Sequence, residues 1–189
     1  MNNNTSYYSD ANKTKLEKDM WLILPDYIIG KVKRADEKLE IAVFGTEKKI
    51  ITEPSICRQA VILHTLPLVS HGCEIEVAFD VAQYLANGAA AIDLIWISEE
   101  SIEPWDSLTI NLGDCPPEDH AYIDVNHNGS DIVEWLIQNR LAEPTGVTRR
   151  SGFYTYPMMK LHMAEIRKYA LPSDDNNENE EGCRMEEFS

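Results

Sequence analysis

The stretch Cys73-Glu-Ile-Glu-Val-Ala-Phe-Asp-Val-Ala-Gln83 decides the fold of this chain of 189 residues. Apolar side chains from Ile75 to Val81 alternate with polar or small ones, which is the period of a strand with one buried face. Ala86-Asn-Gly88 follows and is typical of a hairpin turn. A second alternation, from Ala90 to Trp96, would return beside the first strand. We therefore predict an antiparallel meander that buries one face.

Two further stretches, 108–112 and 121–125, alternate in the same way and extend the predicted meander. Residues 131–141 then carry Ile132, Trp135 and Leu136 at helical spacing, so an apolar helix face could cover the buried side of the sheet. Ser130 or Asn128 would cap this helix. A last strand is expected over residues 153–163, followed by a short helical piece to residue 170. The predicted class is therefore α+β, an antiparallel meander sheet with helices packed on one face.

The N-terminal part predicts an extension made of strands and one helix. Short apolar or β-branched runs there are separated by Pro25, charged residues and Gly45, as strands usually are. Residues 54–66 favour a helix that begins at Pro54 and ends before Pro67. The predicted strands span residues 21–24, 27–32, 39–44 and 49–52. The predicted organisation is a disordered N-terminus (1–18), the strand and helix extension (19–72), an acidic α+β domain (73–170) and a disordered acidic tail (171–189).

The charge of the chain is segregated. The net charge is −15, and residues 74–147 hold fifteen Asp and Glu but a single basic residue, Arg140. Ordinary usage would place roughly nine Lys and Arg in a stretch of that length. A solvated face that only keeps the protein soluble is the simpler interpretation, since most charge blocks serve that purpose. The near absence of lysine gives weight to the other interpretation, a face that binds a cationic partner.

The alternation predicts where the acidic side chains point. If Ile75, Val77 and Phe79 face the core, the carboxylates between them face outward. Side chains two residues apart on a strand are about 6.5–7 Å apart, so such a row could resemble the phosphates of a nucleic acid. The predicted binding residues of this acidic face are Glu74, Glu76, Asp80 and Asp93.

A second candidate site lies in the turn Asp124-Val-Asn-His-Asn-Gly-Ser-Asp131. Oxygen-bearing side chains and a glycine stand at the first positions of a calcium-loop pattern. The twelfth position should supply a carboxylate and is Trp135, so selective calcium binding would be weak. The simpler interpretation is a strand-to-helix turn in which Asn and Ser side chains cap the helix. The candidate residues of this turn are Asp124, Asn126, Asn128 and Asp131.

No catalytic or cofactor motif stands out. The sequence has neither a phosphate-binding loop nor a dinucleotide fingerprint. Four soft metal ligands are spaced like no common zinc site: Cys57, His64, His71 and Cys73. We therefore expect no enzyme activity, no cofactor and no metal.

Residues 149–157, Arg-Arg-Ser-Gly-Phe-Tyr-Thr-Tyr-Pro, interleave cations with aromatic rings. Such a mixture can stack on single-stranded nucleic acid. The anionic block beside it would repel phosphates, so a glycine turn leading into an aromatic strand is the simpler interpretation. We expect no direct contact with nucleic acid.

Nothing in the sequence approaches the ~20 consecutive apolar residues of a membrane-spanning helix. The first ten residues have neither the basic nor the apolar region of a secretory signal. We therefore expect a cytoplasmic protein without a membrane partner.

Three motifs together carry a family resemblance: Asp124-Val-Asn126, Glu143-Pro-Thr-Gly146 and Ser151-Gly-Phe-Tyr-Thr-Tyr-Pro157. Over about residues 74–163 the chain resembles an uncharacterised bacterial family, classed as a domain of unknown function, from plasmids and integrative elements of gut bacteria. The resemblance implies a setting, mobile DNA in a bacterial cytoplasm. It implies no residue roles.

Two functional hypotheses follow. The first is a non-enzymatic acidic interaction protein of a mobile element that docks on a basic protein. A DNA-mimic inhibitor of a nucleic-acid-binding host defence protein is its sharpest version. The alternative is an accessory module that binds a small ligand or a divalent metal at the turn of residues 124–131. A charge that serves solubility alone stays a third interpretation, and the sequence does not indicate an oligomeric state.

Overall fold

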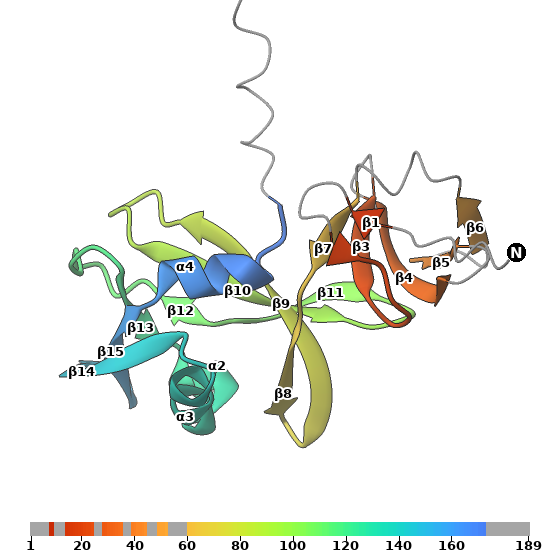
Figure 1. The fold of residues 1–189 in the computed structure, drawn as a ribbon. Coiled ribbons are helices and arrows are strands. Elements are labelled where there is room, and N and C mark those ends of the chain that lie inside the picture. Colours follow the sequence, from red (N-terminus) through yellow and green to blue (C-terminus); the bar gives the residue numbers. More distant parts are fainter. Residues whose placement is uncertain are drawn as a thin grey trace, which may run out of the picture.

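The computed structural model describes residues 8–9, 14–24, 28–35, 39–44, 49–52 and 60–172. Within these residues, strands dominate, and they form three sheets of four or five strands and one two-stranded pair (Figure 1). The longest described helix has eight residues. The expected α+β class is therefore wrong, and the protein has a β-rich fold. Its described helices are too short to form a layer over a sheet.

The central sheet is built around residues 73–83, the stretch with the clearest alternation. It contains β8 (Leu66–Ser70), β9 (Cys73–Gln83), β10 (Ala90–Ile97) and β11 (Ile102–Ser107), in the order β11-β10-β9-β8. The predicted hairpin is confirmed, because β9 and β10 pair antiparallel with Asp80 opposite Asp93. Gly88 in the turn has a φ of 69°, a conformation that glycine adopts without steric cost.

The second sheet contains β12 (Thr109–Ile110), β13 (His120–Ile123), β14 (Ala142–Ser151) and β15 (Tyr154–Leu161), in the order β12-β13-β15-β14. The predicted last strand is confirmed as β15. The sequence did not predict β14, because Pro144 and Gly146 within it are typical of a loop. The structure accommodates them with an irregular register between Pro144 and Thr148, at the edge of the sheet.

The main core lies between the central and second sheets. Phe79 and Leu94 reach it from the central sheet and Ile123 from the second, and all three are fully buried. The predicted helix forms as α3 (Asp131–Gln138), and it adds Ile132 and Leu136 to this core. The other short helices in the described residues are α2 (Val125–Asn128), α4 (Met163–Ile166) and the 3-10 turn η2 (Arg167–Tyr169).

The N-terminal sheet has the order β6-β5-β4-β3-β7. Its strands are β3 (Trp21–Leu24), β4 (Ile28–Ala35), β5 (Leu39–Val43), β6 (Lys49–Thr52) and β7 (Val61–Leu63). The helix expected over residues 54–66 is wrong in its described part, since residues 61–63 and Leu66 lie in strands. Residues 54–59 lie outside the described residues. β7 pairs with β3, so tertiary pairing decides the conformation of this apolar run.

The expected disordered ends fall largely outside the described residues. In the first 18 residues, β1 (Tyr8–Ser9) pairs with β2 (Thr14–Lys15), and Leu16 is buried in the core of the N-terminal sheet. Residues 173–189 lie outside the described part of the chain.

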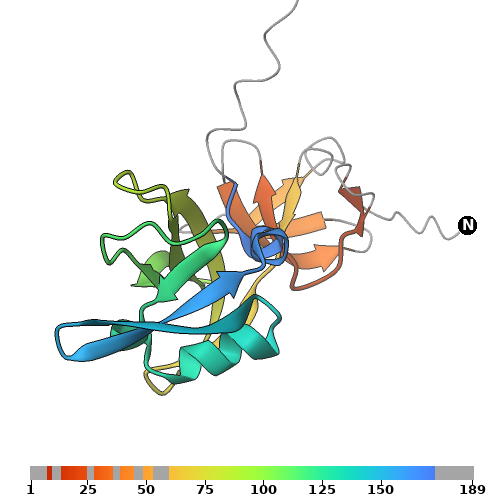
Figure 2. The same ribbon diagram turned by 90° about the vertical axis from the view of Figure 1, so that its left-hand side faces the viewer.

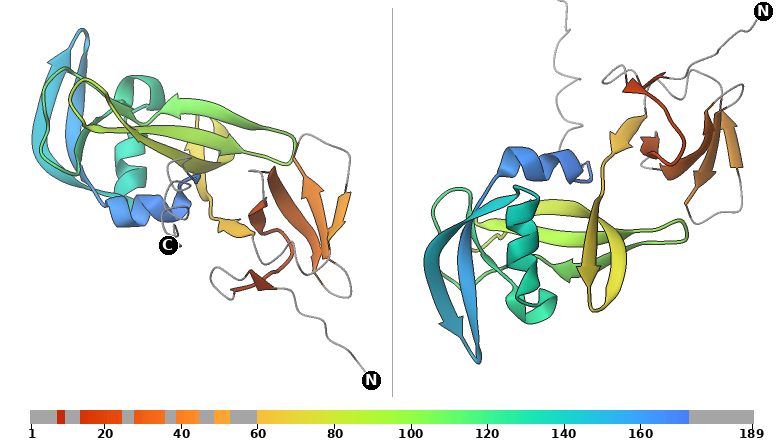
Figure 3. Two further views of the ribbon diagram at one scale, coloured as in Figure 1. Left: turned by 90° about the horizontal axis from the view of Figure 1, so that it is seen from above. Right: turned by 60° about the horizontal axis from the view of Figure 1, so that its bottom comes forward.

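The N-terminal sheet packs against the central sheet at the end opposite the second sheet (Figure 3). Trp21, Ile23 and Leu63 form a buried cluster with the central-sheet residues Ala78, Ile95 and Ile97. These three central-sheet side chains point away from the main core, because they alternate with its residues along β9 and β10. The central sheet is therefore covered on both faces at this place, whereas the sequence predicted one buried face.

Candidate acidic interaction site

The four predicted acidic residues share one face of the β9–β10 hairpin. This outer face carries Ala78 and Ile95 in its middle, with the carboxylates on either side. All four acids are exposed, as expected. Ala78, however, is fully buried under the N-terminal sheet. It stands between Glu76 and Asp80, which are about 13 Å apart along the strand at about 3.3 Å per residue. The predicted continuous row is therefore interrupted, and the acids form two pairs, Glu74 with Glu76 and Asp80 with Asp93.

Asp80 and Asp93 lie directly opposite each other in the β9–β10 register. Side chains in that position have Cβ atoms about 4.5–5.5 Å apart, and two like charges there oppose pairing. The Ser107 hydroxyl donates a 2.6 Å hydrogen bond to the Asp93 carboxylate, which fixes its orientation. Glu76, in the other pair, accepts a 2.7 Å hydrogen bond from the Thr65 hydroxyl. Neutral hydroxyls leave the negative charge of both carboxylates in place.

The cations near the acidic block are paired with other acids. Glu99 accepts from Lys33 Nζ at 2.7 Å and from Lys31 Nζ at 3.2 Å. Hydrogen bonds from Lys33 and Lys31 lower the pKa of Glu99 below its ordinary value. Within the described part of the chain, no Lys or Arg comes within ion-pair distance of the four predicted acids. The two carboxylate pairs therefore keep their charge on the surface.

The predicted turn residues do not converge on a common point. Asp124 is 3% exposed, and its side chain accepts from the backbone N–H groups of Asn126 and His127. It thus caps α2, a short helix that the sequence did not predict. Asn128 donates its side-chain amide to the carbonyls of Ser107 and Asp124. Asp131 is exposed at the start of α3.

Asp124 thus acts as a helix cap, but neither Ser130 nor Asn128, the alternative caps predicted for α3, does so. The Ser130 hydroxyl stands at the N-cap, donates to Asp131 Oδ1 at 3.4 Å and makes no capping hydrogen bond to the helix backbone. Within the described residues, no group of three His, Cys, Asp or Glu is arranged to hold a metal ion.

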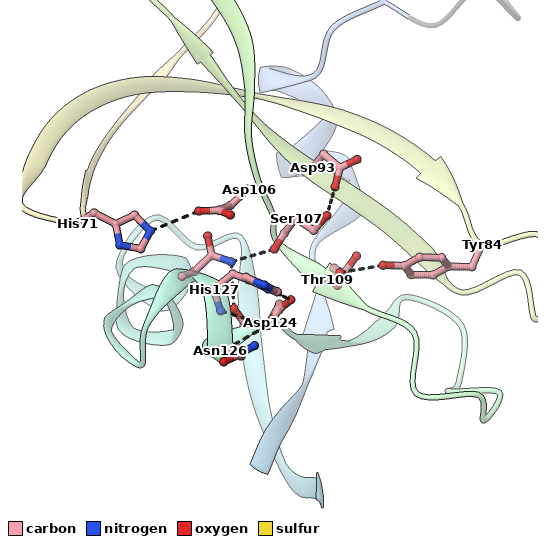
Figure 4. A network of polar contacts seen from close by, with 10 residues as sticks. His71, Tyr84, Asp93, Asp106, Ser107, Thr109, Asp124, Asn126 and His127 are labelled. Carbon is pink, nitrogen blue, oxygen red and sulfur yellow. Dashed lines mark hydrogen bonds and ion pairs between the residues drawn. The ribbon is translucent and has the colours of Figure 1, made fainter. Parts of the chain in front are cut away.

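A polar groove of about 610 Å³ lies beside Asp93, between β10, β11, β12 and α2 (Figure 4). Asp93, Asp106 and Asp124 line it, together with Trp105 and His127. Asp106 was not among the predicted acidic residues of this face. It belongs to β11, opposite Leu94. The groove adds carboxylates to the Asp80–Asp93 pair.

His127 is the cation-forming side chain of this groove. Its Nδ1 lies 2.7 Å from Asp124 Oδ2, and its side chain is 60% exposed. The hydrogen bond to Asp124 and the charge of Asp124 raise the pKa of His127, and Asp106 adds a smaller effect of the same sign. A second histidine, His71, has its Nε2 3.4 Å from Asp106 Oδ2 (Figure 4).

The basic and aromatic segment forms the tip of the β14–β15 hairpin, which projects from the second sheet (Figure 2). Arg149 is held against Asp114, with 2.6 Å between Nη1 and Oδ1, and Tyr122 donates to the other Asp114 oxygen at 2.9 Å. Phe153 is 97% exposed at the tip. The predicted glycine turn is present at Gly152, whose φ is 60°.

A family model described as a domain of unknown function (DUF4313) matches residues 78–180, more than half of the chain. The chain belongs to the DUF4313 family. The match begins within β9 and includes the second sheet, so the N-terminal sheet lies outside it. The resemblance to a family of unknown function is thereby confirmed, and the family description assigns no activity to any residue.

No curated protein and no solved structure matches this DUF4313 chain. None of its described helices is long and apolar enough to cross a membrane.

Proposed function

We propose that this DUF4313 protein is a non-enzymatic interaction protein that binds a basic protein through its acidic outer face. The observation that carries the proposal is the Asp80–Asp93 pair. Two carboxylates stand opposite each other on an exposed strand pair, and no described Lys or Arg neutralises them. Such a pair costs stability. A surface needed only for solubility could place the same charges apart at no cost.

The neighbouring groove supports the same proposal. Asp93 belongs both to the pair and to the groove, where Asp106 adds its carboxylate, whereas the Asp124 carboxylate is buried and already hydrogen-bonded. A cationic side chain of a partner would meet several carboxylates at once, and charges of this kind raise the rate of association. His127, once protonated, would reduce the negative charge of the groove. We therefore infer that binding to a basic partner weakens at low pH.

The setting of the proposal is a bacterial mobile genetic element, which rests on the family resemblance alone. Its sharpest version, a DNA-mimic inhibitor of a nucleic-acid-binding defence protein, needs carboxylates spaced like phosphates. The Glu74–Glu76 pair has such a spacing of about 6.5–7 Å, whereas Asp80 and Asp93 are closer together, and the break at Ala78 limits the match to separate patches. A mimic of this kind would compete with duplex DNA for the same basic groove.

The test uses the chain as bait in lysate of a bacterial host, in parallel with the Asp80→Asn/Asp93→Asn variant. We expect cationic proteins that wild type retains at low salt to be released by salt, and the variant to lose them. Duplex DNA should displace the same proteins if the DNA-mimic version holds. Glu165→Gln is the matched control, because Glu165 is already paired with Lys168 at 2.6 Å. Equal retention by wild type and the Asp80→Asn/Asp93→Asn variant would contradict the proposal.

The alternative, a module for a small ligand or a divalent metal at the turn of residues 124–131, has weaker support. The carboxylate oxygens of Asp124 already form the hydrogen bonds that cap α2 and the contact with the His127 ring. A cation would have to displace these hydrogen bonds before it could be coordinated. Calorimetry with calcium, magnesium and zinc checks this alternative, and a heat of binding that Asp124→Asn removes would revive it.

A further inference from the structure

One edge of β9 is left open in the described structure. β10 pairs with β9 from Glu76 to Gln83, on one side. On the other side, β8 pairs only with the first part of β9, up to Val77. Ala170 then forms a parallel bridge with Phe79. Beyond that bridge, residues 80–83 have no strand neighbour on this side within the described part of the chain.

The hydrogen-bond alternation shows which backbone groups face the open side. Tyr84 N–H donates to Ala89 C=O, so Tyr84, Ala82 and Asp80 point their backbone groups toward the β10 side. The residues between them point the other way. Leu171 N–H confirms this direction, because it donates to Phe79 C=O at 2.8 Å from the open side. The N–H and C=O groups of Val81 and Gln83 therefore face away from β10.

This edge borders a cleft of about 1260 Å³. Small-molecule pockets usually measure about 300–1,000 Å³, so the cleft has room for a segment of polypeptide. Apolar side chains on several elements line it: Ile23, Val61, Ile62, Val81 and Met163. The charged lining consists of Asp80, Glu118 and Asp119 on one hand and Arg167 on the other, with His120 beside them. The cleft is therefore apolar in part and negative in balance.

We propose that an extended basic segment of a partner protein adds to the open edge of β9 as a strand. The segment would bond to the Val81 and Gln83 backbone, place alternate apolar side chains on the cleft wall, and direct its cations to Asp80, Glu118 and Asp119. This inference rests on the proposed function, since it names the form in which the basic partner binds. The pairing of Ala170 and Leu171 with Phe79 shows that this edge already accepts an extended segment.

The C-terminal tail of the chain itself is a poorer occupant. Residues 171–189 contain seven Asp and Glu and a single Arg. Their charge would be repelled by Asp80, Glu118 and Asp119, whereas a basic segment complements these side chains. The charge of the cleft therefore selects a basic occupant.

The probe is a fluorescent hexapeptide of alternating lysine and valine, acetylated and amidated at its ends. Binding to the full chain is measured by anisotropy, and exchange of the Val81 and Gln83 amides by nuclear magnetic resonance. We expect binding that slows the exchange of both amides. A control peptide that is N-methylated at the backbone nitrogens of alternate residues keeps its charges and side chains. It loses the backbone N–H donors at those residues. It should bind about tenfold more weakly, which is the effect of a few hydrogen bonds.

A pair of variants tests the edge from the protein side. Gln83→Pro removes an N–H that faces the cleft and leaves the β10 pairing intact, whereas Gln83→Thr keeps that N–H. We expect Gln83→Pro to weaken peptide binding about three- to tenfold and Gln83→Thr to have little effect. Thermal unfolding of both variants checks that they fold.

The outcomes separate the two proposals. If the peptide does not bind, or if the N-methylated peptide binds as tightly, strand addition at β9 is overturned. If the peptide binds and Asp80→Asn/Asp93→Asn weakens it, yet the Val81 and Gln83 amides exchange freely, the acidic-face proposal stands and strand addition falls. If the amides are protected but a glutamate–valine hexapeptide binds equally well, the edge is a strand-addition site without preference for cations, and the basic occupant is wrong.

Discussion

Replacing Asp80 by Asn should stabilise the fold, although it removes a charged residue from the surface of an acidic protein. Asp80 and Asp93 are exposed and directly opposite on β9 and β10. Asn has almost the same shape as Asp, so the change removes the charge and little else. Asp80 is the better choice of the two, because Asp93 accepts the Ser107 hydrogen bond, whose loss would obscure the result.

The magnitude follows from the register. With the carboxylates roughly 5 Å apart in water, the repulsion between two unit charges is about 0.8 kcal/mol. A Debye length of about 8 Å at physiological salt reduces this to about 0.4 kcal/mol. We therefore expect Asp80→Asn to raise the free energy of unfolding by about 0.4 kcal/mol at physiological salt, and by somewhat more at low salt.

Urea unfolding at low salt, at physiological salt and at about 1 M salt measures the effect, because repulsion between exposed charges is nearly abolished at the highest concentration. Glu74→Gln is the matched control. Glu74 lies on the same face of the same strand but opposite Val69, and its nearest acid, Glu76, is about 6.5–7 Å away, so the same charge change should stabilise the protein only about half as much. The reasoning is refuted if Asp80→Asn lowers the free energy of unfolding, or if the increase in that free energy persists at high salt. Weaker binding to a cationic partner together with higher stability would support a functional role for the pair.

Three other changes test separate parts of the structure. Ala78→Asp should destabilise the protein by about 3 kcal/mol or more in thermal unfolding, because it buries an unpaired charge under the N-terminal sheet. Ala82 lies on the same face but is exposed, so Ala82→Asp should be tolerated. For His127, whose pKa is raised by Asp124, the folded state favours the protonated ring. This stabilisation is fully present below the ordinary pKa of about 6.5 and is lost as pH rises through the raised pKa. His127→Gln should therefore flatten the dependence of the free energy of unfolding on pH over about pH 5 to 9. An unchanged pH dependence in the variant would contradict this. Phe153→Ser should change the free energy of unfolding by less than about 0.5 kcal/mol, since Phe153 is 97% exposed; a larger loss in urea unfolding would mean that the hairpin tip packs on the protein.

The acidic site shows how far alternation along a strand predicts function. The period of two predicted that Glu74, Glu76, Asp80 and Asp93 share one outward face. In the structure they do share one face, and all four are exposed. The same period did not predict that Ala78 is buried on the outward face, since alanine occurs on either face of a strand. Its burial depends on Trp21 and Ile23, which are more than fifty residues away along the chain. A pattern within one strand cannot report what another sheet places upon it.

The failures of the predicted fold class have the same origin. Residues 61–66 fit a helical period and also fit a strand, and pairing of Val61–Leu63 with β3 decides between the two. Pro144 and Gly146 favour a loop, yet they lie in β14, where an edge position and an irregular register tolerate them.

The sequence by itself determined the β9–β10 hairpin, the amphipathic helix α3, the aromatic strand β15 and the segregation of charge, because each depends on neighbours within about ten residues. Only the tertiary structure decided that the central sheet is covered on both faces, that Asp124 caps a helix, and that an edge of β9 opens into an acidic cleft. These features depend on contacts between residues that are distant in the chain. The periodicity within one segment does not report such contacts.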